Sequence, residues 1–179
     1  MAKKTWRLSQ LDNNSYLLCL TVVLATLLLL TLPQTAVAAG TWKIQTNGNL
    51  LYAVSCTDSS HCWAVGESGI IFSTTNGGNS WRPQASGTTN YLYGVSFSDS
   101  SHGWAVGFGG TILATANGGS TWSLQTGGAF NDLYSVCFTD SSHGWAVGLS
   151  GTILATTNGG TTWSPQTSST NVKLKGVCT

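Results

Sequence analysis

A repeat of 41 residues constrains the possible folds of this chain more than any other feature. Three sets of aromatic residues recur at this interval, namely Tyr52, Tyr93 and Tyr134; Trp63, Trp104 and Trp145; and Trp81, Trp122 and Trp163. A constant period of about 20 to 50 residues is typical of proteins that stack copies of one small structural unit. A single unit cannot cover its own apolar face, so neighbouring units must bury that face between them.

Each unit reads as four short strands. In the second unit these are residues 92–97 (LYGVSF), 103–108 (GWAVGF), 111–116 (TILATA) and 121–126 (TWSLQT). β-Branched and aromatic residues dominate the four segments, and Gly, Asn, Asp or Ser fills each gap, as antiparallel hairpins require. Four short strands in each 41-residue unit predict an all-β chain with the β-propeller architecture and four-stranded blades. A single β-sandwich is the alternative.

Strand alternation predicts which side chains are buried together. In the first strand of the second unit, Tyr93, Val95 and Phe97 should share one face. In the next strand, Trp104 and Val106 should share a face. We therefore expect both sets to pack against neighbouring blades.

The predicted propeller region covers residues 39–179, with full blades at about 50–87, 91–127 and 132–168. Residues 41–46 (TWKIQT) match a fourth strand, and residues 175–178 fall where a further first strand would begin. Closed propellers usually have about 4 to 8 blades. We therefore expect a fragment of a longer propeller. The alternatives are a partial fourth blade formed by the two end pieces and a ring assembled from several copies.

The connection between the third and fourth strands is the most specific motif, with the pattern Thr-x-Asn-x-Gly-x-Ser/Thr-Trp. Asn-Gly favours a tight hairpin because both residues tolerate positive φ. The Asn amide can also bond its own turn, and the Trp ring can pack over the Gly. The predicted structural residues of these Asp-box-like turns are Thr74, Asn76, Gly78, Trp81, Thr115, Asn117, Gly119, Trp122, Thr156, Asn158, Gly160 and Trp163.

The first 38 residues have a different composition and predict a secretory signal peptide. Three cations precede an apolar run at residues 16–32, and Ala36-Val37-Ala38 fits a signal-peptidase site. The alternative is an uncleaved anchor, because the run is close to the ~17 residues that span a bilayer. The protein should therefore be exported, and contact a membrane only through this segment if it is retained.

The remainder of the chain is nearly neutral, which excludes two classes of partner. Its only cations are Lys43, Arg82, Lys173 and Lys175, and they form no basic cluster. Binding to nucleic acid or to anionic lipid depends on such clusters, so neither is expected.

Recurrent acidic and histidine residues do not predict a metal or cofactor site. His61, His102 and His143 each end an Asp-Ser-Ser-His turn in a different blade, so they should not converge on one ion. The aspartates that open these turns are expected to accept backbone N–H bonds. We predict structural roles for both and no cofactor.

Two cysteines bracket the first of these turns. Cys56 and Cys62 would lie close together in a hairpin, so a disulfide is possible and would contribute roughly 2 kcal/mol. Counting free thiols in the oxidised protein tests it. Cys137 and Cys178 share a register in successive blades and should not pair.

Asp boxes also occur in sialidases and related glycosidases, but the catalytic residues that such enzymes need are missing. Beyond residue 38 the chain has one arginine, Arg82, and one glutamate, Glu67, and no G-x-S-x-G motif. We therefore predict a binding protein and not an enzyme. The exposed candidates Arg82, Phe130 and Asn131 read as ordinary solvated connectors, which leaves the partner-binding residues unassigned.

The motifs GWAVG, GTILAT and TNGGTTW after an LYxVxF strand resemble the photosystem II stability and assembly factor family across nearly all of residues 41–179. The matching segments of the second unit are 103–107, 110–115 and 117–122. The resemblance implies an exported seven-bladed propeller in the thylakoid lumen, which binds a newly made membrane-complex subunit without catalysis. This chain departs from the family pattern in two respects: it has a single arginine in this region, Arg82, and it has Asn in place of the acidic residue of the Asp box. The alternative is a periplasmic or extracellular scaffold or adhesion propeller that binds protein or glycan.

Overall fold

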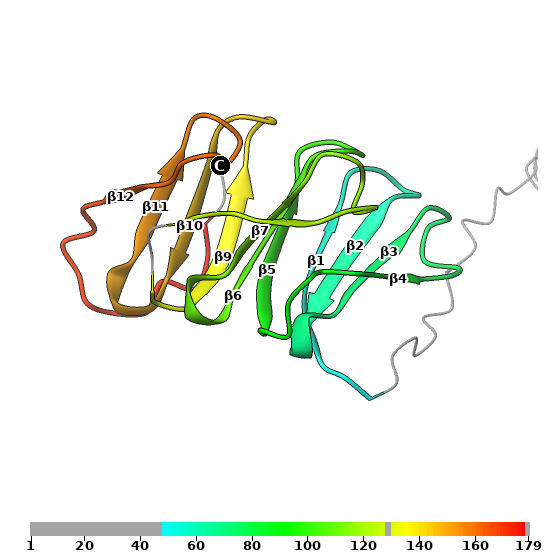
Figure 1. The fold of residues 1–179 in the computed structure, drawn as a ribbon, viewed down its shortest axis with the longest axis horizontal. Coiled ribbons are helices and arrows are strands. Elements are labelled where there is room, and N and C mark those ends of the chain that lie inside the picture. Colours follow the sequence, from blue (N-terminus) through cyan, green and yellow to red (C-terminus); the bar gives the residue numbers. More distant parts are fainter. Residues whose placement is uncertain (1–47, 128–129, 178–179) are drawn as a thin grey trace, which may run out of the picture. The chain divides into compact units, whose positions relative to one another are not determined.

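The computed structural model describes residues 48–127 and 130–177, and Figure 1 shows three successive antiparallel sheets in this region. The predicted signal segment, the TWKIQT piece and Cys178 lie outside the described residues. Each sheet has four strands in chain order, and we call the sheets blades 1, 2 and 3. The predicted all-β propeller architecture is therefore confirmed.

The strands of blade 1 are β1 (Leu51–Cys56), β2 (Cys62–Gly66), β3 (Ile71–Thr74) and β4 (Arg82–Gln84). Those of blade 2 are β5 (Leu92–Phe97), β6 (Gly103–Gly107), β7 (Ile112–Thr115) and β8 (Ser123–Leu124). Those of blade 3 are β9 (Leu133–Phe138), β10 (Gly144–Gly148), β11 (Ile153–Thr156) and β12 (Ser164–Gln166). Short 3-10 turns η1 (Glu67–Gly69), η2 (Phe108–Gly110) and η3 (Leu149–Gly151) join the second and third strands. The fourth strands are shorter than the sequence predicts, and the motif tryptophans precede them.

The core lies between the blades, as the stacking argument requires. Trp104 and Val106 of blade 2 pack with Phe138 of blade 3, which confirms their predicted common face. The Trp104 ring stacks on Phe138 with centroids 3.4 Å apart and planes 4° from parallel. Its indole N–H donates to the Gly159 carbonyl at 2.9 Å. One tryptophan thus supplies both apolar contact and a hydrogen bond across the interface.

Blades 1 and 2 meet through the same contacts one repeat earlier. Trp63 stacks on Phe97 with centroids 3.6 Å apart, and its indole N–H donates to the Gly118 carbonyl at 3.0 Å. In addition, the Ser55 hydroxyl accepts the Phe97 amide at 3.1 Å. The 41-residue repeat therefore encodes one interface that recurs between successive blades.

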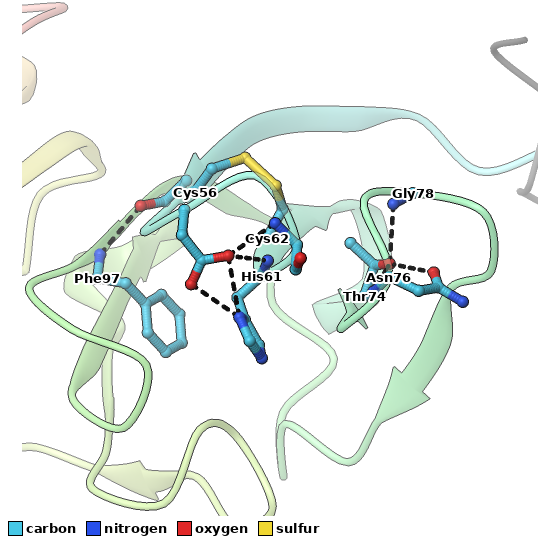
Figure 2. The surroundings of a disulfide bond; sticks show 10 residues. Cys56, His61, Cys62, Thr74, Asn76, Gly78 and Phe97 are labelled. Carbon is cyan, nitrogen blue, oxygen red and sulfur yellow. Dashed lines mark hydrogen bonds and ion pairs between the residues drawn. A yellow bond between two sulfur atoms is a disulfide. The ribbon is translucent and has the colours of Figure 1, made fainter. Parts of the chain in front are cut away.

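In blades 2 and 3, a glycine at the start of the second strand lies against the stacked phenylalanine ring, where a larger residue would not fit. A Cβ at Gly144 would lie 2.6 Å from the Phe138 ring, and one at Gly103 would overlap the Phe97 ring. In blade 1 the same two positions are Cys56 and Cys62, which are joined by a disulfide with their Cα atoms 4.0 Å apart (Figure 2). The disulfide therefore replaces the ring-over-glycine arrangement of the other blades.

The Asp-box-like turns differ from the predicted Asn-Gly geometry. In the turn of blade 1, positive φ occurs at the two adjacent glycines, 66° at Gly77 and 84° at Gly78, and not at Asn76. The buried Thr74 hydroxyl accepts the Gly78 amide at 3.0 Å and donates to the Asn76 side-chain oxygen at 2.9 Å (Figure 2). That same oxygen accepts the Ser80 amide at 3.0 Å. The side chains of Thr and Asn therefore fix a longer turn, and equivalent bonds recur in blades 2 and 3.

We expect Thr74→Val to lower the free energy of unfolding by about 2 kcal/mol. Valine keeps the shape of the side chain but leaves the partly buried amides of Asn76 and Gly78 without their acceptor. Urea unfolding of the two proteins measures the loss. Thr75→Val is the matched control, because Thr75 is exposed and blade 2 has Ala116 at this register. Equal losses from the two variants would contradict the assigned role of the Thr74 hydroxyl.

The outer faces of blades 1 and 3 differ in how far they are exposed within the described residues. Leu51 is 41% exposed and Val54 62% exposed, whereas their blade 2 counterparts, Leu92 and Val95, are 0% and 9% exposed. At the other end, the Leu174 amide donates to the Gly148 carbonyl at 2.9 Å. Residues 172–177 thus lie along blade 3 where a further first strand would begin, although they form no strand.

Candidate functional site

The three repeated tyrosines do not join the core but line a surface hollow. Alternation predicts Tyr93 on the buried face with Val95, and this prediction is wrong because the register of β5 and β6 shifts between Leu92 and Gly94. Tyr93 is the residue that the ladder skips, so its ring turns away from the core and the preceding Leu92 becomes fully buried. The same irregularity bypasses Tyr52 and Tyr134.

The hollow has a volume of about 290 Å³ and is lined by Tyr52, Tyr93, Tyr134, Lys173 and Lys175. We call it the tyrosine trough. Successive ring centroids are 5.5 Å apart from Tyr52 to Tyr93 and 5.5 Å from Tyr93 to Tyr134. The first strands of three blades therefore present a continuous row of aromatic rings to solvent.

Tyr91 adds a further ring to this row. Tyr91 contacts Tyr93 edge-on at 6.4 Å between ring centroids and is 42% exposed. Leu50 and Phe108 are 58% and 53% exposed, and the Phe108 amide donates to the Tyr91 carbonyl at 2.8 Å. Exposed aromatic surface of this kind is typical of protein-binding sites.

Nearby carboxylates help to raise the pKa values of the trough tyrosines in blades 1 and 2. The Tyr52 hydroxyl donates to Glu67 at 3.3 Å, and the pKa of Tyr52 is raised by partial desolvation and then by the Glu67 charge. Desolvation, followed by the charge of Asp132, likewise raises the pKa of Tyr93. Both phenols therefore stay protonated at neutral pH, and the Tyr93 hydroxyl can donate a hydrogen bond to a ligand, whereas that of Tyr52 already donates to Glu67.

Cations line the blade 3 end of the trough. Lys175 has the register of the three tyrosines in the following repeat, and the Lys173 ammonium lies 6.0 Å from the centre of the Tyr134 ring. Within residues 48–127 and 130–177 neither lysine forms an ion pair with a carboxylate. The trough thus combines stacking surfaces, phenol donors and two available positive charges.

The other residues considered from the sequence lie elsewhere. Arg82 is exposed on β4 and Phe130 is 96% exposed in the connection before β9. Asn131 donates to the Thr152 hydroxyl at 3.0 Å, and Asn90 makes the equivalent bond in the preceding repeat. Asn131 is therefore part of the repeated framework. Cys137 is half-buried on β9.

Each histidine turn is self-contained. The Asp58 carboxylate accepts the amides of Ser60 and His61 at 2.7 and 2.9 Å, and it also contacts the His61 ring (Figure 2). The turns at Asp99 and Asp140 repeat these bonds. In the part of the chain that the structure describes, no group of three or more His, Cys, Asp or Glu side chains could hold a metal ion.

These turns should make stability fall in acid. Backbone N–H bonds lower the pKa of Asp58 and Asp140 below the ordinary 3.8, and similar bonds lower that of Asp99 although partial burial opposes them. A lowered pKa stabilises the fold above pH 3.8, and this contribution disappears as the pH falls through the folded-state values. The melting temperature should therefore drop below about pH 4.

The matched control is the triple variant D58N/D99N/D140N, which keeps the side-chain oxygens as acceptors but cannot titrate. Melting temperatures between pH 7 and pH 2.5 should fall less steeply for this variant than for the parent chain. Parallel curves would contradict the role given to the three carboxylates.

The tyrosine period does not by itself predict the trough, because a regular aromatic period is also typical of core packing. One signal was present in the sequence: the fourth member of the series is Lys175 and not an aromatic residue. A buried position does not accept an unpaired lysine, so this change marks a surface position.

Comparison with known proteins connects this geometry to solved structures. No family model matches the sequence, and no curated protein matches it either. The structure is similar to that of YCF48 bound to D1 peptide, with 24% identity, a TM-score of 0.59 and coverage of 65% of this chain and 39% of that chain. The structure is also similar to that of YCF48 from Cyanidioschyzon merolae, with 26% identity and a TM-score of 0.60. This match covers 68% of this chain and 41% of that chain.

A more distant likeness is to an ancestral GH74 enzyme, at 24% identity and a TM-score of 0.51, covering 63% of this chain and 18% of that chain. This likeness shows the propeller fold alone. The present chain spans about two fifths of the length of the YCF48 chains that it matches. These likenesses confirm that the chain resembles the photosystem II stability and assembly factor family.

Proposed function

We propose that this chain is a protein-binding propeller region that holds an extended segment of a partner in the tyrosine trough. The observation that carries the proposal is the row formed by Tyr52, Tyr93 and Tyr134, with Lys173 and Lys175 at one end. Tyrosine offers a large rigid surface and a hydroxyl donor at small entropic cost, which suits it to anchor a peptide. The proposed role is binding, without catalysis.

The proposed partner is a subunit of photosystem II during assembly. Support comes from the structural likeness to YCF48, one structure of which contains D1 peptide. The corresponding location is the thylakoid lumen after export. The described part of the chain contains no helix that meets the length and hydrophobicity of a membrane span.

Binding is tested with a fluorescently labelled D1 peptide and the full chain, by fluorescence anisotropy. We expect saturable binding that weakens at least about tenfold in Tyr93→Ala, since losing a central aromatic anchor costs more than about 1.4 kcal/mol. Phe130→Ala is the matched control, because Phe130 is 96% exposed and does not line the trough. The absence of saturable binding, or equal losses in both variants, would refute the trough as a peptide site.

The role in assembly is tested in a photosynthetic host. Deleting the gene should reduce the amount of assembled photosystem II, and the Tyr93→Ala allele should restore less of it than the parent allele. Normal accumulation of the complex in the deletion strain would reject this part of the proposal.

A further inference from the structure

Charge is distributed unequally along the tyrosine trough. At the blade 1 end, Glu67 accepts hydrogen bonds from the Tyr52 hydroxyl and the Leu50 amide, at 3.3 and 3.2 Å. At the middle of the row, Asp132 is held by the Gly109 amide at 2.8 Å and acts on Tyr93. A ligand over Tyr52 therefore lies next to the Glu67 carboxylate, and Asp132 adds a second negative charge on the same side of the row.

Among the residues that line the hollow, the positive charges lie at the opposite end. Lys173 and Lys175 both line the hollow next to Tyr134, and both are exposed. Neither ammonium has a carboxylate partner among residues 48–127 and 130–177. Two ammonium groups at one end of an aromatic row can hold the two oxygens of one carboxylate.

The position of the acids indicates which carboxylate fits. An acidic side chain over Tyr52 or Tyr93 would face Glu67 or Asp132, and like charges at close range are unfavourable. A segment with a single negative charge at its last residue avoids both. The ring-to-ring steps of 5.5 Å mean that the row spans roughly three to four residues of an extended peptide, which advances ~3.3 Å per residue.

We propose that the lysine end of the trough binds the free C-terminal carboxylate of the partner segment, whose preceding residues lie along the tyrosines toward Tyr52. This inference rests on the proposed function, because it assigns a direction and a terminal group to the same ligand. It assigns Lys173 and Lys175 to the carboxylate and the three tyrosines to the rest of the segment.

The experiment compares two forms of one probe. The D1 peptide is synthesised with a free C-terminal carboxylate and with a C-terminal amide, and each is titrated into the full chain at low ionic strength. We expect the amide to bind at least about tenfold more weakly. In Lys173→Met/Lys175→Met the two forms should bind within about twofold of each other, because the groups that distinguish them are gone.

Arg82→Met is the matched control, since it removes an exposed cation outside the trough. This variant should keep the preference for the free carboxylate. Methionine retains most of the lysine stem, and both lysines are exposed, so urea unfolding should show unchanged stability in the double variant.

The outcomes separate this inference from the proposed function. Equal binding of both peptide forms, with Tyr93→Ala still weakening both, would overturn the carboxylate assignment and leave the peptide site intact. A preference that persists in the double lysine variant would also overturn it. So would a dependence on acidic side chains, revealed by peptides with Glu replaced by Gln. No binding of either form would remove both proposals.

Discussion

Trp104→Ala is expected to lower the free energy of unfolding by about 3–5 kcal/mol, the largest effect of any substitution considered. The Trp104 ring is 2% exposed and stacks on Phe138 across the interface between blades 2 and 3. Alanine leaves a cavity at this contact and also leaves the Gly159 carbonyl without its indole donor. Urea unfolding followed by tryptophan fluorescence or far-ultraviolet circular dichroism measures the change.

Trp145→Ala is the matched control for this prediction. Trp145 has the same register in blade 3 but is only half-buried, and no aromatic ring stacks on it within the described residues. Its replacement should cost less than about 2 kcal/mol. If Trp145→Ala is as damaging as Trp104→Ala, then position in the strand and not the interface stack determines the loss.

Gly107→Ala should cost about 3 kcal/mol and should also weaken peptide binding in the trough. A Cβ at Gly107 would overlap the Tyr91 carbonyl oxygen and lie 3.0 Å from the Leu92 Cα. The only relief is a shift of the strand start that carries Tyr91 and Tyr93. Gly66 and Gly148 approach the equivalent backbone in blades 1 and 3, so the requirement is general.

Gly109→Ser is the control, two residues away. Gly109 has φ 61° and open space around its Cα, and the equivalent residues Ser68 and Ser150 adopt 53° and 55°. Serine should therefore change stability by no more than about 1 kcal/mol. Urea unfolding and peptide titration of both variants check the pair. A harmless Gly107→Ala would contradict the close backbone contact.

The sequence predicts the repeated framework well because that framework depends on short-range patterns. Four strands per unit, the common face of Trp104 and Val106, and stacking of one unit on the next all follow from period and alternation. The propeller architecture is confirmed for the same reason.

The site was harder to predict because it depends on an exception to alternation. Tyr93 leaves the core because the pairing of β5 with β6 shifts register between Leu92 and Gly94. No local residue pattern predicts that shift. The predicted positive φ at the Asn of the Asn-Gly turns is also wrong. The side chains of Thr74 and Asn76 bind the turn backbone and move positive φ onto the two glycines.

Blade 1 differs from blades 2 and 3 in the contact that holds together the end of its first hairpin, which is a disulfide instead of a stacked phenylalanine. Phe97 and Phe138 each stack on a tryptophan of the preceding blade, whereas the Cys56–Cys62 bond forms within one blade. The first strand of blade 1, where Leu51 and Val54 are exposed, is therefore joined covalently to the second strand. Reduction of this disulfide would consequently loosen the β1–β2 hairpin while leaving the ring stacks between the blades in place.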